Sequence, residues 1–442
     1  MPFRKFFDRS DKPSASAEPE AAEPEQEPSD EEFSGEAEAP PEHSDAVDWR
    51  ARAAHVLPMG ASTGSKRPAA LYGADDALGP THFSGAVGCR VFDVDGNEYV
   101  DCTMALGSVA LGYAEPTVTR AVIDAATNGN VAALSDYREV ELAERLCDVI
   151  PCAEMVQFLK TGAEATSAAV RLARAYTGRD VVIGCGYFGW HDWSSSAPGV
   201  PTGTTARYKV IPFDDVPALE AAVAAAGTEL AAIIIEPVIE RMPLPRWAAR
   251  ARELCDAAGA ALIFDEVKTG FRLSTGGYQE HSKITPDLAA FGKAMANGYP
   301  LSAVVGKRAL MEAARKTWIS STLASESTAL AAAGAVLDWH EKADICDSLA
   351  AIGLELRESM NAVIKASGVG GVTVDGIDHM WLLRFDTPAR ERRFLELAAG
   401  QGVLFKRGAY NFPAIAHDND IVQRIEAAAN AAFIELREEE AS

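Results

Sequence analysis

The chain has 442 residues, and its 48% content of hydrophobic residues is enough to bury a large core in two or more subdomains. Its formal net charge is −23, which argues against a nucleic-acid partner because phosphate contacts require clustered Lys and Arg. The sequence contains no run of about 18 apolar residues, the length that predicts a membrane span, and we expect no secretory leader.

Much of the charge lies in residues 1–48, which we predict to be a disordered acidic tail. Asp11 to Asp48 include 14 acidic residues and one lysine, so this stretch carries −13 of the −23. The segment is rich in Pro, Ala, Ser and Glu and poor in aromatic residues, so it cannot bury enough surface to offset the entropy cost of ordering. A solubilising leader is one interpretation, and a tail that docks a partner protein is the alternative.

The seven cysteines are scattered along the chain, and none of them belongs to a Cys-x-x-Cys pair. An odd number of cysteines without such spacing favours reduced, mostly buried thiols over a disulfide framework or a zinc site. We therefore predict a cytoplasmic protein without a metal centre.

The segment 49–115 follows the tail, and its residues 91–101 predict two short strands around an Asp-Gly-Asn turn. Over residues 116–336, helical periodicity alternates with short apolar runs. Four of these runs, bounded by glycines and charged residues, are typical of strands buried on both faces: 156–159, 181–184, 231–235 and 261–264. Helices between such strands predict a large α/β domain with a mostly parallel sheet.

The pattern changes after residue 336. The elements predicted there are a strand, a helix with a cap residue and a proline at its start, a second strand and a final amphipathic helix, at residues 380–385, 387 onward, 403–405 and 422–436. We expect residues 337–442 to form a small α+β domain, to which the segment 49–115 contributes.

A phosphate-binding turn is predicted between a strand and a helix. Residues 160–166 follow the apolar run 156–159 and lead into a stretch with apolar residues at helical spacing. A glycine before a helix leaves backbone N–H groups free to face an anion, so the turn at Gly162 is a candidate, with the Thr161 hydroxyl beside it. The alternative is an ordinary turn capped by Thr161. A second cluster of hydroxyl side chains, in residues 320–327, is either a helix cap or a further phosphate contact.

The loop 184–193 contains four aromatic residues and a histidine among glycines. Such a loop favours a stacking platform for a flat ring, and Tyr187, directly after the strand, is the candidate for the ring face. A small hydrophobic cluster is the alternative. We interpret His191 as a hydrogen-bonded structural histidine rather than as a base.

Two acids follow predicted strands, Glu236 after 231–235 and Asp265 after 261–264. Their separation of 29 residues fits one β-α-β crossover, so both are expected at the edge of the sheet where ligands collect. Glu236 is a candidate substrate contact, although an acid at a strand end is commonly only solvated. Val267 is the candidate for the ring face opposite Tyr187.

Lys293 lies in a turn flanked by glycines. A strand that ends in a carboxylate and a lysine on a tight loop are the pair that pyridoxal phosphate (PLP) chemistry requires. The amine forms a Schiff base, and the carboxylate keeps the pyridine nitrogen protonated. The released amine can then move a proton. The alternatives are a helix-end lysine at the surface, and Lys268 or Lys283 as the reactive amine.

From residue 56 to the C-terminus, the chain resembles the class III aminotransferases among the fold-type I PLP enzymes, and most of all the glutamate-1-semialdehyde 2,1-aminomutase subgroup. The segments that carry the resemblance are 93–101, 161–165, 173–179, 187–189, 265–272 and 292–293. The resemblance implies a large domain with a mostly parallel seven-stranded sheet, a small α+β domain, and a homodimer with shared active sites.

The resemblance also implies roles for single residues. Lys293 would be the Schiff-base lysine, Asp265 the partner of the pyridine nitrogen and Tyr187 the stacking ring. Gly162 and Ala163 would be backbone donors to the phosphate. Thr322 would reach the phosphate across the dimer interface.

The chain departs from the family pattern in substrate-facing regions. Ala163 stands where a threonine is usual, and Phe188 where a histidine is usual. Residues 238–243 are bulkier than in aminomutases, and 406–411 lack the Glu-Ala of that subgroup. Arg67 falls near a region that holds substrate carboxylate, with a plain surface arginine as the alternative. The departures bear on the reaction rather than on cofactor binding.

We therefore predict a homodimeric PLP enzyme that transfers an amino group between an amino acid or amine and a carbonyl compound. Within this enzyme class, intramolecular 2,1-amino transfer and racemisation are the alternatives, because they use the same lysine. An inactive relative that binds a partner through its acidic tail is the alternative of another class.

Overall fold

The computed structural model describes residues 48–442, all of which belong to one compact unit. The predicted acidic tail lies outside the described residues except for Asp48, whose carboxylate accepts a hydrogen bond from the Ala51 N–H at the start of α1. Among the helices of residues 48–442, none is long and apolar enough to cross a membrane.

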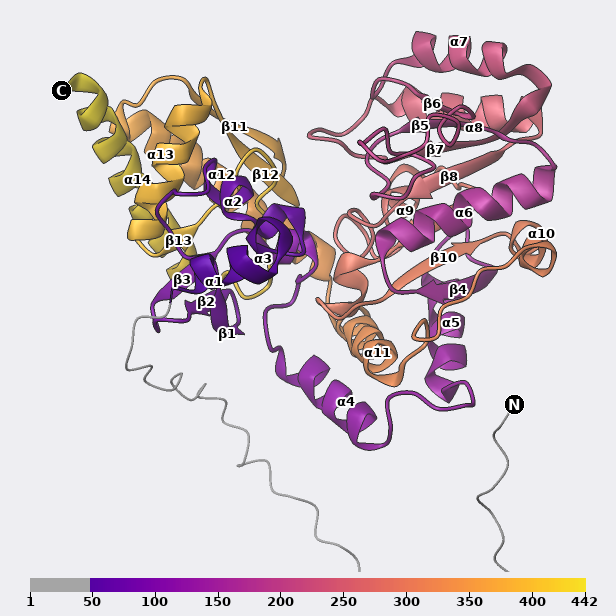
Figure 1. The fold of residues 1–442 in the computed structure, drawn as a ribbon, viewed down its shortest axis with the longest axis horizontal. Helices are drawn as coiled ribbons and strands as arrows, with labels where there is room; N and C mark the ends of the chain where they lie inside the picture. The colour runs from indigo at the N-terminus through magenta and orange to yellow at the C-terminus, as the bar shows by residue number, and fades with distance from the viewer. Residues whose placement is uncertain (1–47) are drawn as a thin grey trace, which may run out of the picture. The chain divides into compact units, whose positions relative to one another are not determined.

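The elements alternate between strands and helices along most of the chain (Figure 1). The strands are β1 (Phe83–Val87), β2 (Arg90–Asp93), β3 (Glu98–Asp101), β4 (Met155–Leu159), β5 (Val181–Cys185), β6 (Tyr208–Val210), β7 (Leu230–Ile235), β8 (Ala261–Asp265), β9 (Leu288–Phe291), β10 (Ser302–Gly306), β11 (Val372–Ile377), β12 (Met380–Phe385) and β13 (Val403–Leu404). The α-helices are α1 (Trp49–Val56), α2 (Pro68–Tyr72), α3 (Met104–Gly107), α4 (Pro116–Thr127), α5 (Tyr137–Val149), α6 (Gly162–Thr177), α7 (Val216–Ala226), α8 (Pro245–Ala258), α9 (Tyr278–Ser282), α10 (Arg308–Met311), α11 (Ser327–Lys342), α12 (Ile345–Ser367), α13 (Pro388–Gly400) and α14 (Asn419–Ala441). A short 3-10 turn, η5 (Lys293–Ala296), follows β9.

The main sheet has seven strands in the order β4-β10-β9-β8-β7-β5-β6. Its neighbouring strands are parallel except for the two pairs that β10 forms, with β4 and with β9. The prediction of a mostly parallel α/β sheet is confirmed.

Helices cover both faces of this sheet, which is why its strands are apolar throughout. On one face, Ala165 and Leu172 of α6 pack in a cluster with Ile263 of β8. On the other face, Leu262, the residue before Ile263 in β8, belongs to a second cluster that contains Trp247 of α8. Each fully buried Leu or Ile side chain among them stabilises the fold by about 1.5–3 kcal/mol relative to an exposed one.

Segments that are far apart in the sequence join in the smaller sheets. β13 pairs in parallel with β3, so Val403 lies beside Val100 in a sheet of order β1-β2-β3-β13. β11 and β12 form an antiparallel pair, and α13 packs on α14 through Phe394 and Phe433, whose ring centres are 4.4 Å apart. The domain boundaries predicted at residues 115 and 336 stay a prediction.

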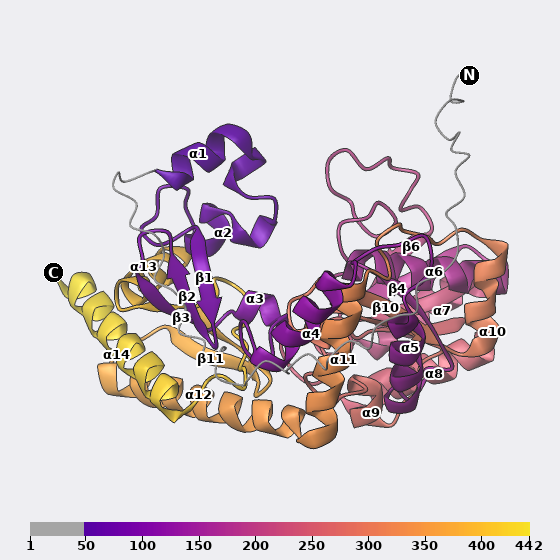
Figure 2. The same ribbon diagram turned by 90° about the horizontal axis from the view of Figure 1, so that it is seen from below.

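The long helices α11 and α12 follow each other but pack on different parts of the chain. α11 lies against α4 and α5 (Figures 1 and 2), and it also packs on η5. α12 starts three residues after the end of α11 and packs on α14 and β11 instead.

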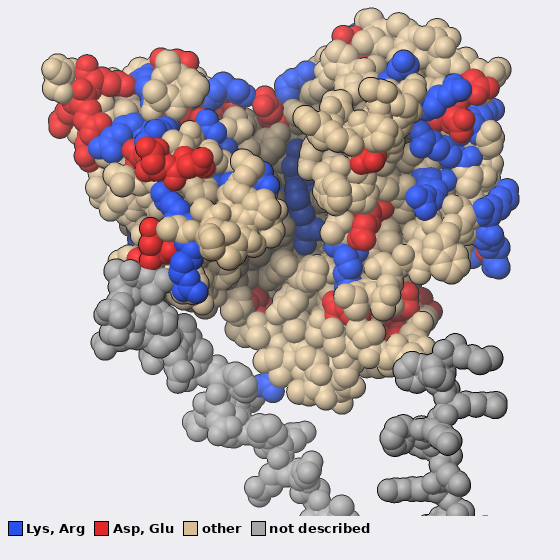
Figure 3. All heavy atoms as spheres, viewed as in Figure 1, with Lys and Arg blue, Asp and Glu red and all other residues tan. Residues whose placement is uncertain are grey.

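Charged side chains of both signs are interspersed on the face shown in Figure 3. Several ion pairs in the described part of the chain join neighbouring helices. Between α13 and α14, Arg390 and Arg393 form ion pairs of 2.5 Å with Glu440 and Glu439. Exposed pairs of this kind contribute little to stability, about 0–1 kcal/mol each.

Candidate active site

The two strand-end acids lie side by side at one edge of the sheet. Asp265 is the last residue of β8, and Glu236 follows β7. In the parallel β7–β8 pair, Ile235 lies opposite Phe264, so the next residue of each strand is one of the two acids. The carboxyl ends of parallel strands are where open α/β sheets bind ligands.

Lys293 is brought to the same edge by the next strand along the sheet. Asp265 pairs with Ala290 of β9, and Lys293 comes three residues later as the first residue of η5. Its φ of +47° is in the left-handed region, which costs a non-glycine residue about 1–2 kcal/mol. Backbone strain of this kind is concentrated at functional sites.

Burial shifts the pKa values of both Lys293 and Asp265. Burial lowers the pKa of Lys293 to about 8, and the positive charge of Lys268 acts in the same direction. Asp265 is 5% exposed. Burial, with the negative charge of Glu236, raises the pKa of Asp265 to about 7, although its Oδ1 accepts a hydrogen bond of 3.0 Å from the Val267 N–H.

A cavity of about 440 Å³ opens at this edge. It brings together eight of the ten predicted site residues: Thr161, Gly162, Ala163, Tyr187, Glu236, Asp265, Val267 and Lys293.

The predicted phosphate turn forms one wall of the cavity. Thr161 caps α6: its Oγ1 accepts a hydrogen bond of 3.2 Å from the Glu164 N–H, and its own N–H donates to Glu164 at 2.9 Å. The Gly162 and Ala163 N–H groups are in the first helical turn, where no intrahelical partner exists. A Cβ at Gly162 would lie 3.0 Å from Val267 Cγ1, so the turn and Val267 are in close contact.

The aromatic loop lines the same cavity next to the phosphate turn, since a Cβ at Gly189 would lie 2.3 Å from Ala163 Cβ. The Tyr187 N–H donates to Glu236 Oε2 at 3.2 Å, while Tyr187 as a residue is 74% exposed. His191 Nδ1 lies 2.7 Å from Ser167 Oγ of α6, to which the Trp193 indole N–H also donates at 2.8 Å. His191 thus ties the loop to α6, in keeping with its interpretation as a structural histidine.

Two predicted site residues lie outside this cavity. Thr322 lines another hollow, with residues 128–138. Arg67 precedes α2, and its Nε–H donates to the Ala61 carbonyl at 3.4 Å. The hydroxyl groups of residues 320–327 do not cap α11. The Glu326 carboxylate caps this helix instead, because it accepts the N–H groups at the helix start.

Lys268 is the cavity residue whose role sequence reasoning missed. Its Nζ lies 2.5 Å from Glu236 Oε1 and 4.5 Å from the centre of the Tyr410 ring. A second lysine of the cavity, Lys160, pairs with Glu326 at 2.9 Å. The sequence signal for Lys268 was its place three residues after Asp265, but nothing nearby indicated its partners.

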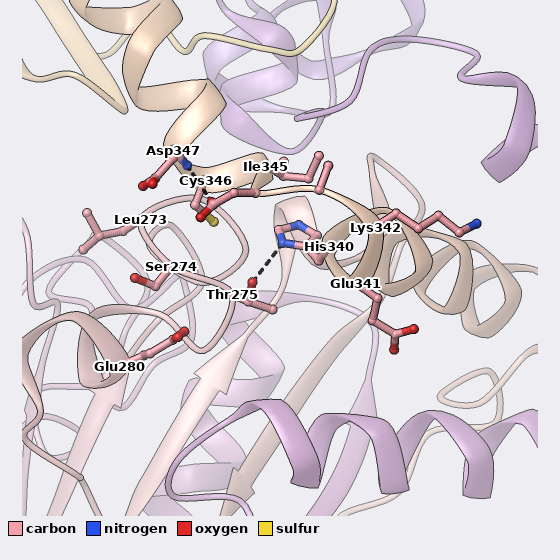
Figure 4. A pocket seen from close by; sticks show the side chains of 12 residues that line it. Leu273, Ser274, Thr275, Glu280, His340, Glu341, Lys342, Ile345, Cys346 and Asp347 are labelled. Carbon is pink, nitrogen blue, oxygen red and sulfur yellow. Dashed lines mark hydrogen bonds between the residues drawn. The ribbon is translucent and has the colours of Figure 1, made fainter.

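A separate hollow of about 420 Å³ lies where α11 meets α12 (Figure 4). There His340 Nδ1 is 2.9 Å from Thr275 Oγ1, and burial lowers the pKa of His340 to about 4. Burial raises the pKa of Cys346 to about 12. None of the predicted site residues lines this hollow.

A profile of the aminotransferase class-III family matches residues 74–189 and 191–416. The chain belongs to this family. The 3-aminobutyryl-CoA aminotransferase of Cloacimonas acidaminovorans is 38% identical over 299 residues, which cover 66% of this chain and 72% of the relative. The glutamate-1-semialdehyde 2,1-aminomutase 2 of Brevibacillus brevis is 32% identical over 420 residues, or 86% and 96% of the two chains. Among solved structures, the FumI protein of Sphingopyxis sp. MTA144, in its PLP internal aldimine form, has a TM-score of 0.84 at 28% identity over 89% of this chain and 97% of that one.

This class-III aminotransferase is therefore a PLP-dependent enzyme of amino-group transfer with the fold-type I architecture, as predicted. The cavity fits the cofactor chemically. It offers a lysine amine of lowered pKa and a buried carboxylate of raised pKa. It also presents the first N–H groups of a helix, which favour a phosphate.

Proposed function

We propose that this class-III aminotransferase moves an amino group between a small amino acid or amine and a separate carbonyl acceptor, with Lys293 and Asp265 as its catalytic residues. The observation that carries the proposal is that one cavity holds both side chains beside the start of α6. PLP, when bound, supplies an aldehyde that captures amino groups and a ring that takes up electrons.

In this proposal, Lys293 holds the cofactor and moves the proton. With a pKa of about 8, a larger share of its amine is unprotonated near neutral pH than in an ordinary lysine, whose pKa is about 10.4. Only the unprotonated amine is a nucleophile. Once released, the same amine would take a proton from the substrate carbon and pass it to the cofactor, as amino transfer requires.

Asp265 is proposed to hold the pyridine nitrogen in its protonated form. Burial raises the pKa of Asp265 although the positive charges of Lys293 and Lys268 oppose this rise, and a protonated ring nitrogen would give the carboxylate a further cationic partner. Val267 and Tyr187, which line the same cavity, would hold the two faces of the ring. The N–H groups of Gly162 and Ala163 would bind the phosphate at the positive end of α6.

We also propose a homodimer in which Thr322 of each chain completes the phosphate site of the other. Thr322 is outside the cavity of its own chain, and it lines a hollow with exposed apolar side chains. Three of these, Val131, Leu134 and Tyr137, are 49–85% exposed. Contiguous exposed apolar surface usually marks an interface.

The cytoplasm remains our proposed compartment. All seven thiols are unpaired and six of them are buried, as expected where thiols stay reduced.

The experiment that tests the function is an absorption spectrum of the purified protein with PLP under a panel of amino donors. Wild-type protein should show a bound-cofactor band that one or more donors bleach, and borohydride should leave a pyridoxyl tag on Lys293. Lys293→Ala should show neither, whereas Lys283→Ala, which removes an exposed lysine after α9, should behave as wild type. A tag on any other lysine would contradict the assignment.

Intramolecular 2,1-amino transfer is the second candidate, because the Brevibacillus brevis aminomutase matches over most of both chains. A requirement for a keto-acid acceptor would indicate transamination between two molecules. Turnover without an acceptor would indicate a mutase or a racemase, which chiral analysis of the recovered substrate separates. Deleting residues 1–48 should leave turnover intact if the tail has only a solubilising or docking role.

A further inference from the structure

The turn that carries Lys293 is tied to a distant part of the chain by one side chain, that of Asn297. Both residues belong to this turn and have a left-handed backbone, with φ values of +47° for Lys293 and +45° for Asn297. The Asn297 Oδ1 accepts hydrogen bonds of 3.0 Å from the Ala110 and Leu111 N–H groups. Its Nδ2 donates to the Gly112 carbonyl at 2.9 Å. Asn297 is only 7% exposed, and a buried polar group with a full set of partners fixes the local structure.

The segment that Asn297 holds begins with a strained turn, α3. All four residues of α3 have left-handed φ values: +42° at Met104, +49° at Ala105, +60° at Leu106 and +78° at Gly107. Residues other than glycine visit this region singly as a rule, because their Cβ crowds the following carbonyl oxygen. A run of three persists only where the surrounding structure holds it, and such strain is concentrated at functional sites. The residue after the turn, Ser108, lines the cavity.

A second buried side chain holds the same segment from the side of Asp265. Arg272 follows Asp265 in the same loop and is fully buried, and its guanidinium donates to the Gly107 carbonyl at 3.2 Å. The loops that carry Asp265 and Lys293 are therefore both anchored on residues 107–112. This short segment braces the two proposed catalytic residues against each other.

The Lys293 turn and the segment are also in direct contact. Gly298, the residue after Asn297, has a φ of +96°, and a Cβ there would lie 3.0 Å from Val109 Cγ2. Without the Asn297 side chain, the strain of α3 would favour a movement of the segment away from the turn. A displacement of about 1 Å can cost about 100-fold in rate where reacting groups must be aligned.

We propose that Asn297 is a positioning residue for Lys293: by binding residues 110–112, it holds the lysine turn against the strained segment, so that the amine stays in the cavity beside Asp265. The inference rests on the proposed function, in which Lys293 captures PLP. Asn297 does not itself line the cavity, so it acts through the turn and not on the cofactor or the substrate.

The test compares two ligands on the cofactor-free full chain. Stopped-flow absorbance measures the capture of PLP, and a fluorescence titration measures the affinity for pyridoxine 5′-phosphate, which has the same ring and phosphate but an alcohol in place of the aldehyde. Asn297→Gly keeps the left-handed backbone and removes the three hydrogen bonds. It should capture PLP at least about tenfold more slowly than wild type, with an affinity for pyridoxine 5′-phosphate within about twofold of the wild-type value.

Two further variants separate the side chain from the backbone. Asn297→Asp keeps an oxygen acceptor for the Ala110 and Leu111 N–H groups and loses only the donor to Gly112. Its maximal capture rate at high pH, where its added charge no longer affects the protonation of the lysine, should lie between the wild-type rate and that of the glycine variant. Lys283→Gly is the matched control, because Lys283 is an exposed residue with a similar φ of +59°, and it should behave as wild type.

Equal capture rates in Asn297→Gly and wild type would overturn the inference. Equal losses of capture rate and of pyridoxine 5′-phosphate affinity would also overturn it, because they would indicate a general role in the fold. If the glycine variant did not fold, a wild-type maximal rate in Asn297→Asp would overturn it instead.

A measurement without PLP keeps this result separate from the proposed function. Competitive acetylation of the cofactor-free protein, followed by mass spectrometry, reports the pKa of Lys293, which burial lowers to about 8. Two positive side chains lower this pKa further and two carboxylates raise it, namely Lys268, Arg272, Glu236 and Asp265. Asn297→Gly should move it toward the ordinary lysine value of about 10.4, because the amine leaves its buried position. If wild-type protein captured no PLP, the proposed function would fail, and an unchanged pKa in Asn297→Gly would still overturn the role of Asn297.

Discussion

The aromatic loop and the phosphate turn meet at Gly189, so a single added methyl group at this position should disturb both. Gly189 has a φ of +93°, and a Cβ there would lie 2.3 Å from Ala163 Cβ. A non-glycine residue in this backbone region costs about 1–2 kcal/mol, and overpacking costs typically about 1–3 kcal/mol. Gly189→Ala should therefore lower the free energy of unfolding by about 2–5 kcal/mol.

The same substitution should weaken PLP binding. Ala163 carries one of the N–H groups that we propose as phosphate donors, and a Cβ at Gly189 would push it away. A lost hydrogen bond to a charged group is worth about 1.5–3 kcal/mol, or roughly 10–100-fold in affinity. Urea unfolding of the cofactor-free protein and PLP titration by absorbance measure the two effects.

Gly199→Ala is the control that separates backbone strain from the clash. Gly199 has a nearly equal φ of +97°, but no atom lies within 4 Å of its Cβ position. This variant should lose only about 1–2 kcal/mol of stability and bind PLP normally. If both variants lost the same stability and bound PLP equally well, the contact between loop and turn would not be what supports the phosphate site.

Three further predictions concern protons and the partner subunit. Burial and the positive charge of Lys268 hold the pKa of Lys293 at about 8, so cofactor-free protein should capture PLP faster as the pH rises through about 8. Lys268→Met should raise the pH at which the capture rate is half-maximal, as measured by stopped-flow absorbance. Burial lowers the pKa of three histidines to about 4, namely His340, His379 and His417. Their neutral forms stabilise the fold fully above pH 6.5, the ordinary histidine value, so the free energy of unfolding from urea melts should fall as the pH drops from 6.5 toward 4. Thr322→Val should weaken PLP binding by roughly 10–100-fold, the effect of losing a hydrogen bond to a charged group worth about 1.5–3 kcal/mol, and equal affinity in an absorbance titration would remove Thr322 from the site.

The strands were predictable from the sequence where helices cover both faces of the sheet. β4, β5, β7 and β8 lie within one residue of the apolar runs 156–159, 181–184, 231–235 and 261–264. A strand buried on both faces is apolar at every position, so the signal is continuous. β9 and β10 are equally buried but were not singled out, because they consist mainly of small residues or begin with a serine. The antiparallel direction of β10 depends on which strands lie beside it, and the composition of a strand does not reveal its neighbours.

The cavity could be predicted in outline because strand order places its residues. Glu236 and Asp265 end neighbouring parallel strands, so one crossover length was enough to bring them together. The partners of Lys268 were beyond that reasoning, since Tyr410 is 142 residues away and strand order does not tell which way the Lys268 side chain turns. Sequence reasoning therefore treated Lys268 as a rival reactive amine and Glu236 as a separate substrate contact, whereas in the fold each is the other's counterion. Whether a charge in an active site is free to meet a substrate depends on such a partner, so it has to be inferred from the fold.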